Sequence, residues 1–111
     1  MTAKDILTEI VKKAKGSTTL ATDLKGMEKS FQFSTTEGSK FYVKISGGNI
    51  DLSDGEIQKP TAAVSGSDST LETLFMGKLD PVKAFMSGQI KVSGDIFSAQ
   101  KLTDIIKKAG K

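Results

Sequence analysis

The side chains that most often carry out catalysis are largely missing from this sequence. It contains no histidine and no cysteine, which removes the usual proton shuttle at neutral pH, the thiolate nucleophile and the commonest metal ligands. Acid–base chemistry would depend on carboxylates such as Asp51, Asp54 and Glu56, or on the single tyrosine, Tyr42. These residues fall in turns or on a polar strand face, where burial is not expected to shift a pKa, and no nucleophile has a recognisable spacing from a base. We therefore expect no enzyme activity, no catalytic residues, no bound metal and no cofactor.

Two pairs of large apolar residues, Phe75-Met76 and Phe85-Met86, are more distinctive. Each pair ends a short helical pattern, and a glycine follows it within two residues. Methionine is flexible and polarizable, so it suits the wall of a site that accepts apolar molecules of varied shape, as phenylalanine also does. Apolar residues at such spacing are also typical of an ordinary core, and the residues alone leave both interpretations open.

The charge pattern gives weak support to nucleic-acid binding. The net charge is +3, and all 16 basic residues are lysines, which lack the planar fork that grips phosphate or guanine with two hydrogen bonds. Small clusters at Lys12-Lys13-Lys15 and Lys107-Lys108-Lys111 are consistent with transient contact with an acidic membrane surface or with anionic headgroups. The first 16 residues have no long apolar run, so we expect a soluble, cytoplasmic protein.

The periodicity of apolar residues predicts the elements that position these side chains. A capping box of Thr2 and Asp5 begins a helix that ends at Gly16. After a polar connection over residues 17–26, alternation with a period of two predicts an antiparallel meander with one apolar and one wet face. The first strand begins at Lys29, and the next three cover residues 41–46, 49–52 and 61–65. The pattern then predicts two short helices, a strand over residues 89–93 and a last helix from about residue 96. Together these elements form an α+β fold with helices on one face of the sheet. We expect one domain over residues 1–111.

Helix boundaries are also marked in the second half of the chain. Asp68 or Ser69 can cap the first short helix, and Ser69 with Glu72 matches a capping box. Asp80 followed by proline is a strong start for the second helix. Glycines at positions 77 and 88 predict helix ends with a left-handed backbone, and the glycine at position 94 is expected to end the last strand.

The stretch GKLDPVKAFMSGQIKVSGD, which begins at Gly77, resembles the hallmark of the sterol carrier protein 2 (SCP2) family. Phe31-Gln32-Phe33, residues 41–44 and residues 98–102 also fit that family, so the likeness covers nearly the whole chain. The resemblance implies a five-stranded, mostly antiparallel mixed sheet with helices on one face and an apolar tunnel between them. It also implies binding and transfer of a fatty acid, fatty acyl-CoA, sterol or phospholipid, in a stand-alone prokaryotic-type member of the family.

On this resemblance and the Phe-Met pairs, we expect the tunnel wall to be formed by Phe75, Met76, Phe85, Met86, Ile90, Val92, Leu102, Ile105 and Ile106. Residues 98–109 would act as a movable apolar lid. Phe31, Phe33 and the apolar residues of the next two strands would simply pack against the first helix. The alternative function is a non-catalytic accessory or dimerisation module that assists lipid-metabolising enzymes.

Overall fold

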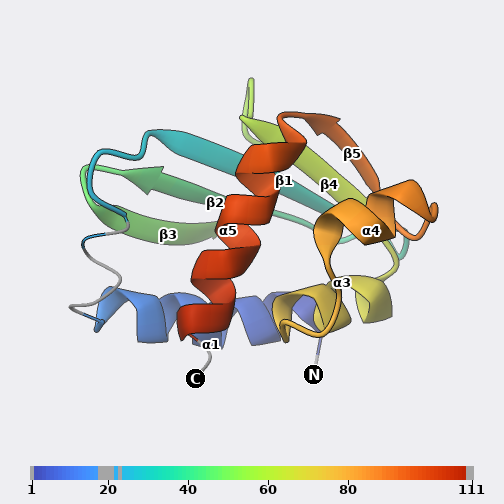
Figure 1. The fold of residues 1–111 in the computed structure, drawn as a ribbon, viewed down its shortest axis with the longest axis horizontal. Helices are drawn as coiled ribbons and strands as arrows, with labels where there is room; N and C mark the ends of the chain where they lie inside the picture. Colours follow the sequence, from blue (N-terminus) through green and yellow to red (C-terminus); the bar gives the residue numbers. More distant parts are fainter. Residues whose placement is uncertain (1, 18–21, 23, 110–111) are drawn as a thin grey trace.

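The predicted order of helices and strands is confirmed. The structure is a computed structural model that describes residues 2–17, 22 and 24–109; part of the predicted connection over residues 17–26 lies outside these residues. Figure 1 shows a sheet with the helices gathered on one side of it. In chain order the elements are α1 (Ala3–Lys15), β1 (Lys29–Thr35), β2 (Lys40–Ser46), β3 (Asn49–Asp54), β4 (Ala62–Gly66), α3 (Asp68–Phe75), α4 (Pro81–Met86), β5 (Lys91–Gly94) and α5 (Ile96–Ala109).

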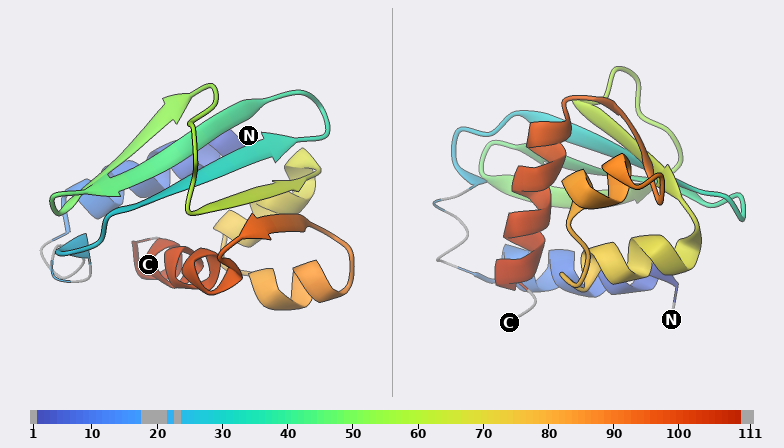
Figure 2. Two further views of the ribbon diagram at one scale, coloured as in Figure 1. Left: turned by 90° about the horizontal axis from the view of Figure 1, so that it is seen from above. Right: turned by 45° about the vertical axis from the view of Figure 1, so that its right-hand side comes forward.

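The sheet is mixed, with the strand order β3-β2-β1-β4-β5. The first three strands form the predicted antiparallel meander, but its extension into the fourth strand is wrong, because β4 pairs with β1 in parallel. The chain crosses from one edge of the sheet to the other side of β1 between Gly55 and Thr61 (Figure 2). Thr61 then fixes the register of β4: its N–H donates to the Ser30 carbonyl at 2.7 Å, and its hydroxyl accepts from the Ser30 N–H at 3.1 Å. Alternation of apolar and polar residues along a strand shows which face is buried, but it does not show which strands lie beside it or in which direction they run.

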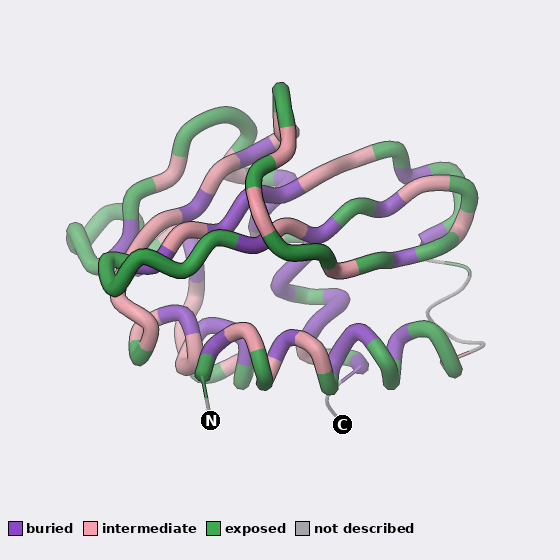
Figure 3. The backbone as a smooth tube through the Cα atoms, turned by 180° about the vertical axis from the view of Figure 1, so that it is seen from behind, coloured by how far each residue is buried: buried purple, intermediate pink, exposed green. Residues whose placement is uncertain are grey.

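An aromatic cluster joins the sheet to the helices. The rings of Phe33 and Phe41 stack at 5.6 Å, and Phe75 from α3 meets the ring of Phe33 edge-on at 5.1 Å. Such pairs stabilise beyond their buried area. Leu7, with its neighbours on the same stripe of α1, is buried in the same core. Figure 3 shows buried positions alternating with accessible ones along the strands.

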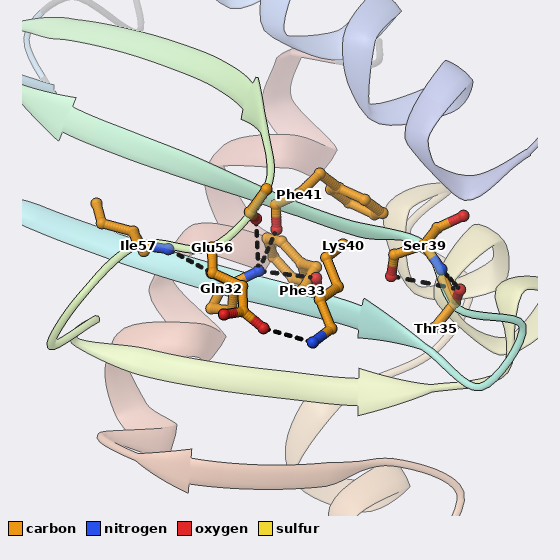
Figure 4. A network of polar contacts seen from close by, with 9 residues as sticks. Gln32, Phe33, Thr35, Ser39, Lys40, Phe41, Glu56 and Ile57 are labelled. Atoms are coloured by element: carbon orange, nitrogen blue, oxygen red, sulfur yellow. Dashed lines mark hydrogen bonds and ion pairs between the residues drawn. The ribbon is translucent and has the colours of Figure 1, made fainter.

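The outer face of the sheet is less wet than predicted. Gln32 points away from the helices yet is buried, because residues 55–57 cover it (Figure 4). Its amide nitrogen donates to the carbonyls of Phe33, Phe41 and Gly55 at 3.0–3.1 Å, and its carbonyl oxygen accepts from the N–H of Ile57 at 2.8 Å. One buried side chain thus ties the crossing segment to two strands.

Most of the predicted helix boundaries are confirmed. Thr2 and Asp5 form the capping box of α1, and Asp80 caps α4. The predicted cap of α3 is wrong: Ser67 accepts from the N–H of Thr70 at 3.2 Å, while the carboxylate of Asp68 accepts from the N–H of Ala3 at 3.1 Å. Ser67 is thus the N-cap of α3, and Asp68, the next residue, joins the start of α3 to the start of α1.

The predicted glycine ends of the short helices are confirmed, with φ of +78° at Gly77 and +80° at Gly88. The last strand begins two residues later than predicted, and Gly94 pairs with Ala62 as its final residue. No helix in the described part of the chain is long and apolar enough to span a bilayer.

Candidate functional site

A small apolar cavity lies between the sheet and the later helices. Its volume is about 10 Å³, which is room for about one water molecule. It is lined by three sheet residues, by the end of α3 and the start of α4, and by one face of α5: Phe31, Phe33, Val64, Leu74, Phe75, Pro81, Ala99, Leu102, Thr103 and Ile106. Pockets that hold small molecules have about 300–1,000 Å³, so the predicted tunnel is not open here.

The lining is apolar apart from one hydroxyl. Thr103 is buried, and its hydroxyl donates to the Ala99 carbonyl at 3.0 Å within α5. No carboxylate or lysine is among the lining residues. The position can therefore receive hydrocarbon without leaving a polar group unpaired, and it offers no group for proton transfer.

The predicted tunnel residues separate into two sets. The first set packs inside the protein. Phe75, Leu102 and Ile106 line the cavity, whereas Ile90 and Ile105 are buried elsewhere in the core and Val92 is half-buried against it. The second set is the exposed residues Met76, Phe85 and Met86. The structure thus brings three of the predicted residues to one position and leaves both methionines at the surface.

The second set lies at the C-terminal ends of the two short helices. Pro81 and Ala84 are the buried positions of α4, whereas Phe85, near the end of that helix, is 43% exposed. Met86 is 79% exposed. Phe97, in the first turn of α5, is 78% exposed and was not singled out in the sequence.

Several cavity residues were missed by the sequence analysis. Phe31 and Phe33 were assigned to packing against α1, although the period of two placed them on the face that meets α5 as well. Ala99 has the same spacing as Leu102 and Ile106 on α5 and could have been found. Pro81 gave no such signal, because its place in the wall depends on how α4 packs against α5.

Hydrogen bonds hold the start of α5 in addition to its apolar face. The carboxylate of Asp95 accepts from the N–H groups of Phe97 and Ser98, and from the Ser98 hydroxyl at 2.8 Å. The Ser98 hydroxyl, with its backbone N–H, holds the pKa of the Asp95 carboxyl below its ordinary value. Lys29 on β1 donates to the same hydroxyl at 3.0 Å.

The carboxylates considered for catalysis are engaged in surface ion pairs. Asp51 lies 2.8 Å from the ammonium of Lys15, and Asp54 and Glu56 pair with other lysines. A hydrogen bond from Lys40 and its charge lower the pKa of Glu56, which makes it a weaker base. None of these groups lines the cavity.

Comparisons with known proteins agree with this architecture. A family model described as the SCP-2 sterol transfer family matches residues 7–107. Peroxisomal multifunctional enzyme type 2 of Mus musculus is 36% identical over 89 residues, which cover 73% of this chain and 12% of that protein. The chain spans 12–19% of the length of the first curated relatives that it matches.

Solved structures show the same fold. Sterol carrier protein 2 from Yarrowia lipolytica has a TM-score of 0.72 at 19% identity, over 95% of this chain and 90% of that one. Palmitated SCP2L2 from Aedes aegypti has a TM-score of 0.70 at 20% identity, over 96% and 95%. Because the family model spans nearly the whole sequence, this chain belongs to the SCP-2 sterol transfer family.

Proposed function

We propose that this protein binds one lipid, with its acyl chain or similar apolar body between the sheet and helices α3, α4 and α5, and carries it to membranes or enzymes. The observation that carries the proposal is the cavity, where apolar walls from the sheet and three helices meet with no charged group. Membership of a sterol transfer family supports it, and so does the palmitated relative of the same fold.

Binding requires the layers to separate. A cavity of about 10 Å³ cannot contain an acyl chain, so α5 and α4 must move away from β1 and β4. Burying ten methylenes contributes roughly 8 kcal/mol, which must exceed the costs of association and of the packing given up. The resulting wall would include Phe75, Leu102 and Ile106, and Ile90, Val92 and Ile105 would join it as the space widens. Met76, Phe85 and Met86 would lie at its mouth.

Transport without catalysis is the second part of the proposal. The cavity lining has no acid or base to activate its one hydroxyl, Thr103, so the ligand would leave chemically unchanged. The cytoplasmic location and the single domain expected from the sequence stay predictions, which cell fractionation and limited proteolysis would test.

Native mass spectrometry of the gently purified protein tests the proposal directly. We expect an added mass of a few hundred daltons that extraction identifies as a fatty acid or another lipid. Titration with a fluorescent fatty acid should then show one saturable site. A protein that carries no lipid and also fails to bind the fluorescent fatty acid would contradict the proposal.

A second candidate function is an accessory module of lipid-metabolising enzymes. It is favoured by the curated relatives, in which the matched stretch is a small part of a longer protein such as Peroxisomal multifunctional enzyme type 2. Recovery of the protein without lipid, together with a stable enzyme partner, would support this candidate over the carrier.

A further inference from the structure

A lysine lies beside one end of the apolar cavity, on the face of the sheet that meets the helices. Lys29 and Phe31 are two positions apart on β1, so their side chains point to the same face, about 6.6 Å apart along the strand. Phe31 lines the cavity. On the neighbouring strand, the residue opposite Lys29 is Ile45, which is fully buried. A half-buried lysine thus follows directly from the apolar wall, with its stem against hydrocarbon.

Helix α5 supplies the other side of this position. Its first turn lies at the sheet, and the helix runs from there to α1 (Figure 1). The ammonium of Lys29 donates to the hydroxyl of Ser98 at 3.0 Å, and the residue after Ser98, Ala99, lines the cavity. Both partners of this hydrogen bond are therefore within two positions of a wall residue, on two different elements. The bond marks the end of the cavity at which β1 and α5 begin.

The charge of Lys29 has no ion-pair partner among the described residues, whose ion pairs use other lysines. Asp95 lies beyond the Ser98 hydroxyl. Its carboxylate already accepts from that hydroxyl and from the N–H groups of Phe97 and Ser98. A half-buried cation bonded to a neutral hydroxyl is stabilised less than one bonded to an anion, because hydrogen bonds between two ionised groups are the stronger ones. Lys29 can therefore gain from a ligand that brings its own negative charge.

An open groove connects Lys29 with solvent. It has a volume of about 480 Å³ and lies between the start of β1, the end of β2 and the crossing segment, with Lys29, Lys44 and Lys59 in its wall. The carboxylate in that wall, Glu28, accepts hydrogen bonds from the hairpin between β2 and β3. A polar headgroup held by Lys29 would thus remain in contact with water while the chain attached to it lies in the interior.

We propose that Lys29 binds the carboxylate of the lipid, so that this protein selects fatty acids over neutral lipids of the same length. The inference rests on the proposed carrier function and adds the direction in which the ligand lies. The carboxylate accepts from the Lys29 ammonium at the groove. The acyl chain then follows β1 past Phe31 to Phe33, where the ring of Phe75 meets that of Phe33 at 5.1 Å.

Lys107 is the competing lysine, because it is also half-buried and follows Ile106 of the cavity wall. Successive residues of a helix point about 100° apart, so Lys107 does not share the direction of Ile106. Its stem lies against Gly77 instead, where a Cβ would be 2.8 Å from the Cγ of Lys107. Residues two apart on a strand do share a direction, and this register favours Lys29.

Calorimetric titration with dodecanoate and with dodecanol, its neutral counterpart, tests the proposal. Lys29→Met keeps the apolar stem and removes the charge. We expect it to bind dodecanoate roughly 30-fold more weakly, which corresponds to about 2 kcal/mol for one hydrogen bond to a charged group. Its affinity for dodecanol should stay close to that of the unchanged protein. Lys29→Arg restores the charge and should recover most of the preference for dodecanoate, whereas Lys107→Met, the matched control, should keep that preference.

The ratio of the two Kd values separates a headgroup site from a merely structural lysine. If Lys29→Met weakened both ligands equally, Lys29 would only hold the start of α5, and the proposal would be wrong. A ratio that changes in Lys107→Met rather than in Lys29→Met would also overturn it. Should Lys29→Met not fold, the Nζ resonance of Lys29, assigned by its loss in Lys29→Arg, supplies a second measurement. It should shift with dodecanoate and not with dodecanol, and a resonance that neither ligand moves would contradict the proposal.

Failure of this inference is distinguishable from failure of the carrier function. If the unchanged protein binds dodecanol and dodecanoate, and Lys29→Met leaves their Kd ratio unchanged, the carrier function stands and the role of Lys29 is wrong. If the unchanged protein binds neither ligand, both are wrong.

Discussion

Leu102→Ala tests whether the cavity is the place that opens for a ligand. Leu102 lies on α5, is 2% exposed and lines the cavity. The substitution removes three carbons, about 2.4 kcal/mol of transfer free energy, and adds a cost for the enlarged cavity. We expect a total loss of about 3.5 kcal/mol in the free energy of unfolding. The melting temperature should fall by about 15 °C, since the unfolding entropy of a chain of this length is about 0.23 kcal/mol/K.

The same variant should bind dodecanoate more tightly than the unchanged protein does. Ligand entry must break the packing of α5 against the sheet, and Leu102→Ala has already lost part of that packing. The carbons of the ligand then fill the enlarged space. If binding recovers about 1.4 kcal/mol of the cavity cost, the Kd falls about ten-fold. Isothermal titration calorimetry measures the Kd, and thermal unfolding with and without dodecanoate measures the recovery.

Leu7→Ala is the matched control. Leu7 is fully buried on α1 but does not line the cavity. The loss of stability should be similar, because the same three carbons leave the same core, whereas the Kd for dodecanoate should stay near that of the unchanged protein. If both variants gained affinity equally, general loosening would explain the effect. If Leu102→Ala weakened binding, the cavity would not be the place that opens.

Three further predictions concern the framework around the site. Gly94→Ala should destabilise the fold by about 2 kcal/mol or more, measured by urea unfolding, because φ is +85° and a Cβ would lie 2.5 Å from the carbonyl oxygen of Thr61. Gln32→Leu should cost about 3 kcal/mol in the same assay, since it removes the hydrogen bonds that tie the Gln32 amide to the Phe41 carbonyl of β2 and to the Ile57 N–H of the crossing segment. The melting temperature should fall as the pH drops below about 4. The Ser98 hydroxyl and backbone N–H lower the pKa of Asp95 in the folded protein, so Asp95 of the unfolded chain takes up a proton at a higher pH. The stabilisation is fully present above the pKa of Asp95 in the unfolded chain and is lost as the pH falls through its lower pKa in the folded protein. Asp95→Asn should make that fall shallower, and an unchanged pH dependence would contradict the role of this carboxylate.

The site was less predictable than the elements that form it. Phe75 and Met76 are neighbours with similar hydrophobicity, yet Phe75 is 1% exposed and Met76 is 53% exposed. The helical period predicted the buried face of α3 that ends at Phe75, and Met76, the cap residue that follows, lies off that face. Pro81 and Thr103 enter the cavity wall only because α4 packs against α5. That placement depends on contacts between residues about twenty positions apart.

The sequence by itself determined the local structure. The capping residues Thr2 and Asp80, the period of two in the strands and the glycines that end α3 and α4 act over a few neighbouring positions, so each could be predicted without its surroundings. Family membership was equally accessible, because its hallmark is one continuous stretch beginning at Gly77.

Only the tertiary structure decided how these elements meet. It placed β4 parallel to β1, buried Gln32 under the crossing segment and separated the cavity wall from the exposed side chains of Met76, Phe85 and Met86. Each of these outcomes depends on which distant segment covers a residue, and a residue's own type and spacing do not encode that. The burial of a side chain is a property of the assembled layers, whereas its secondary structure is largely a property of its neighbours in the chain.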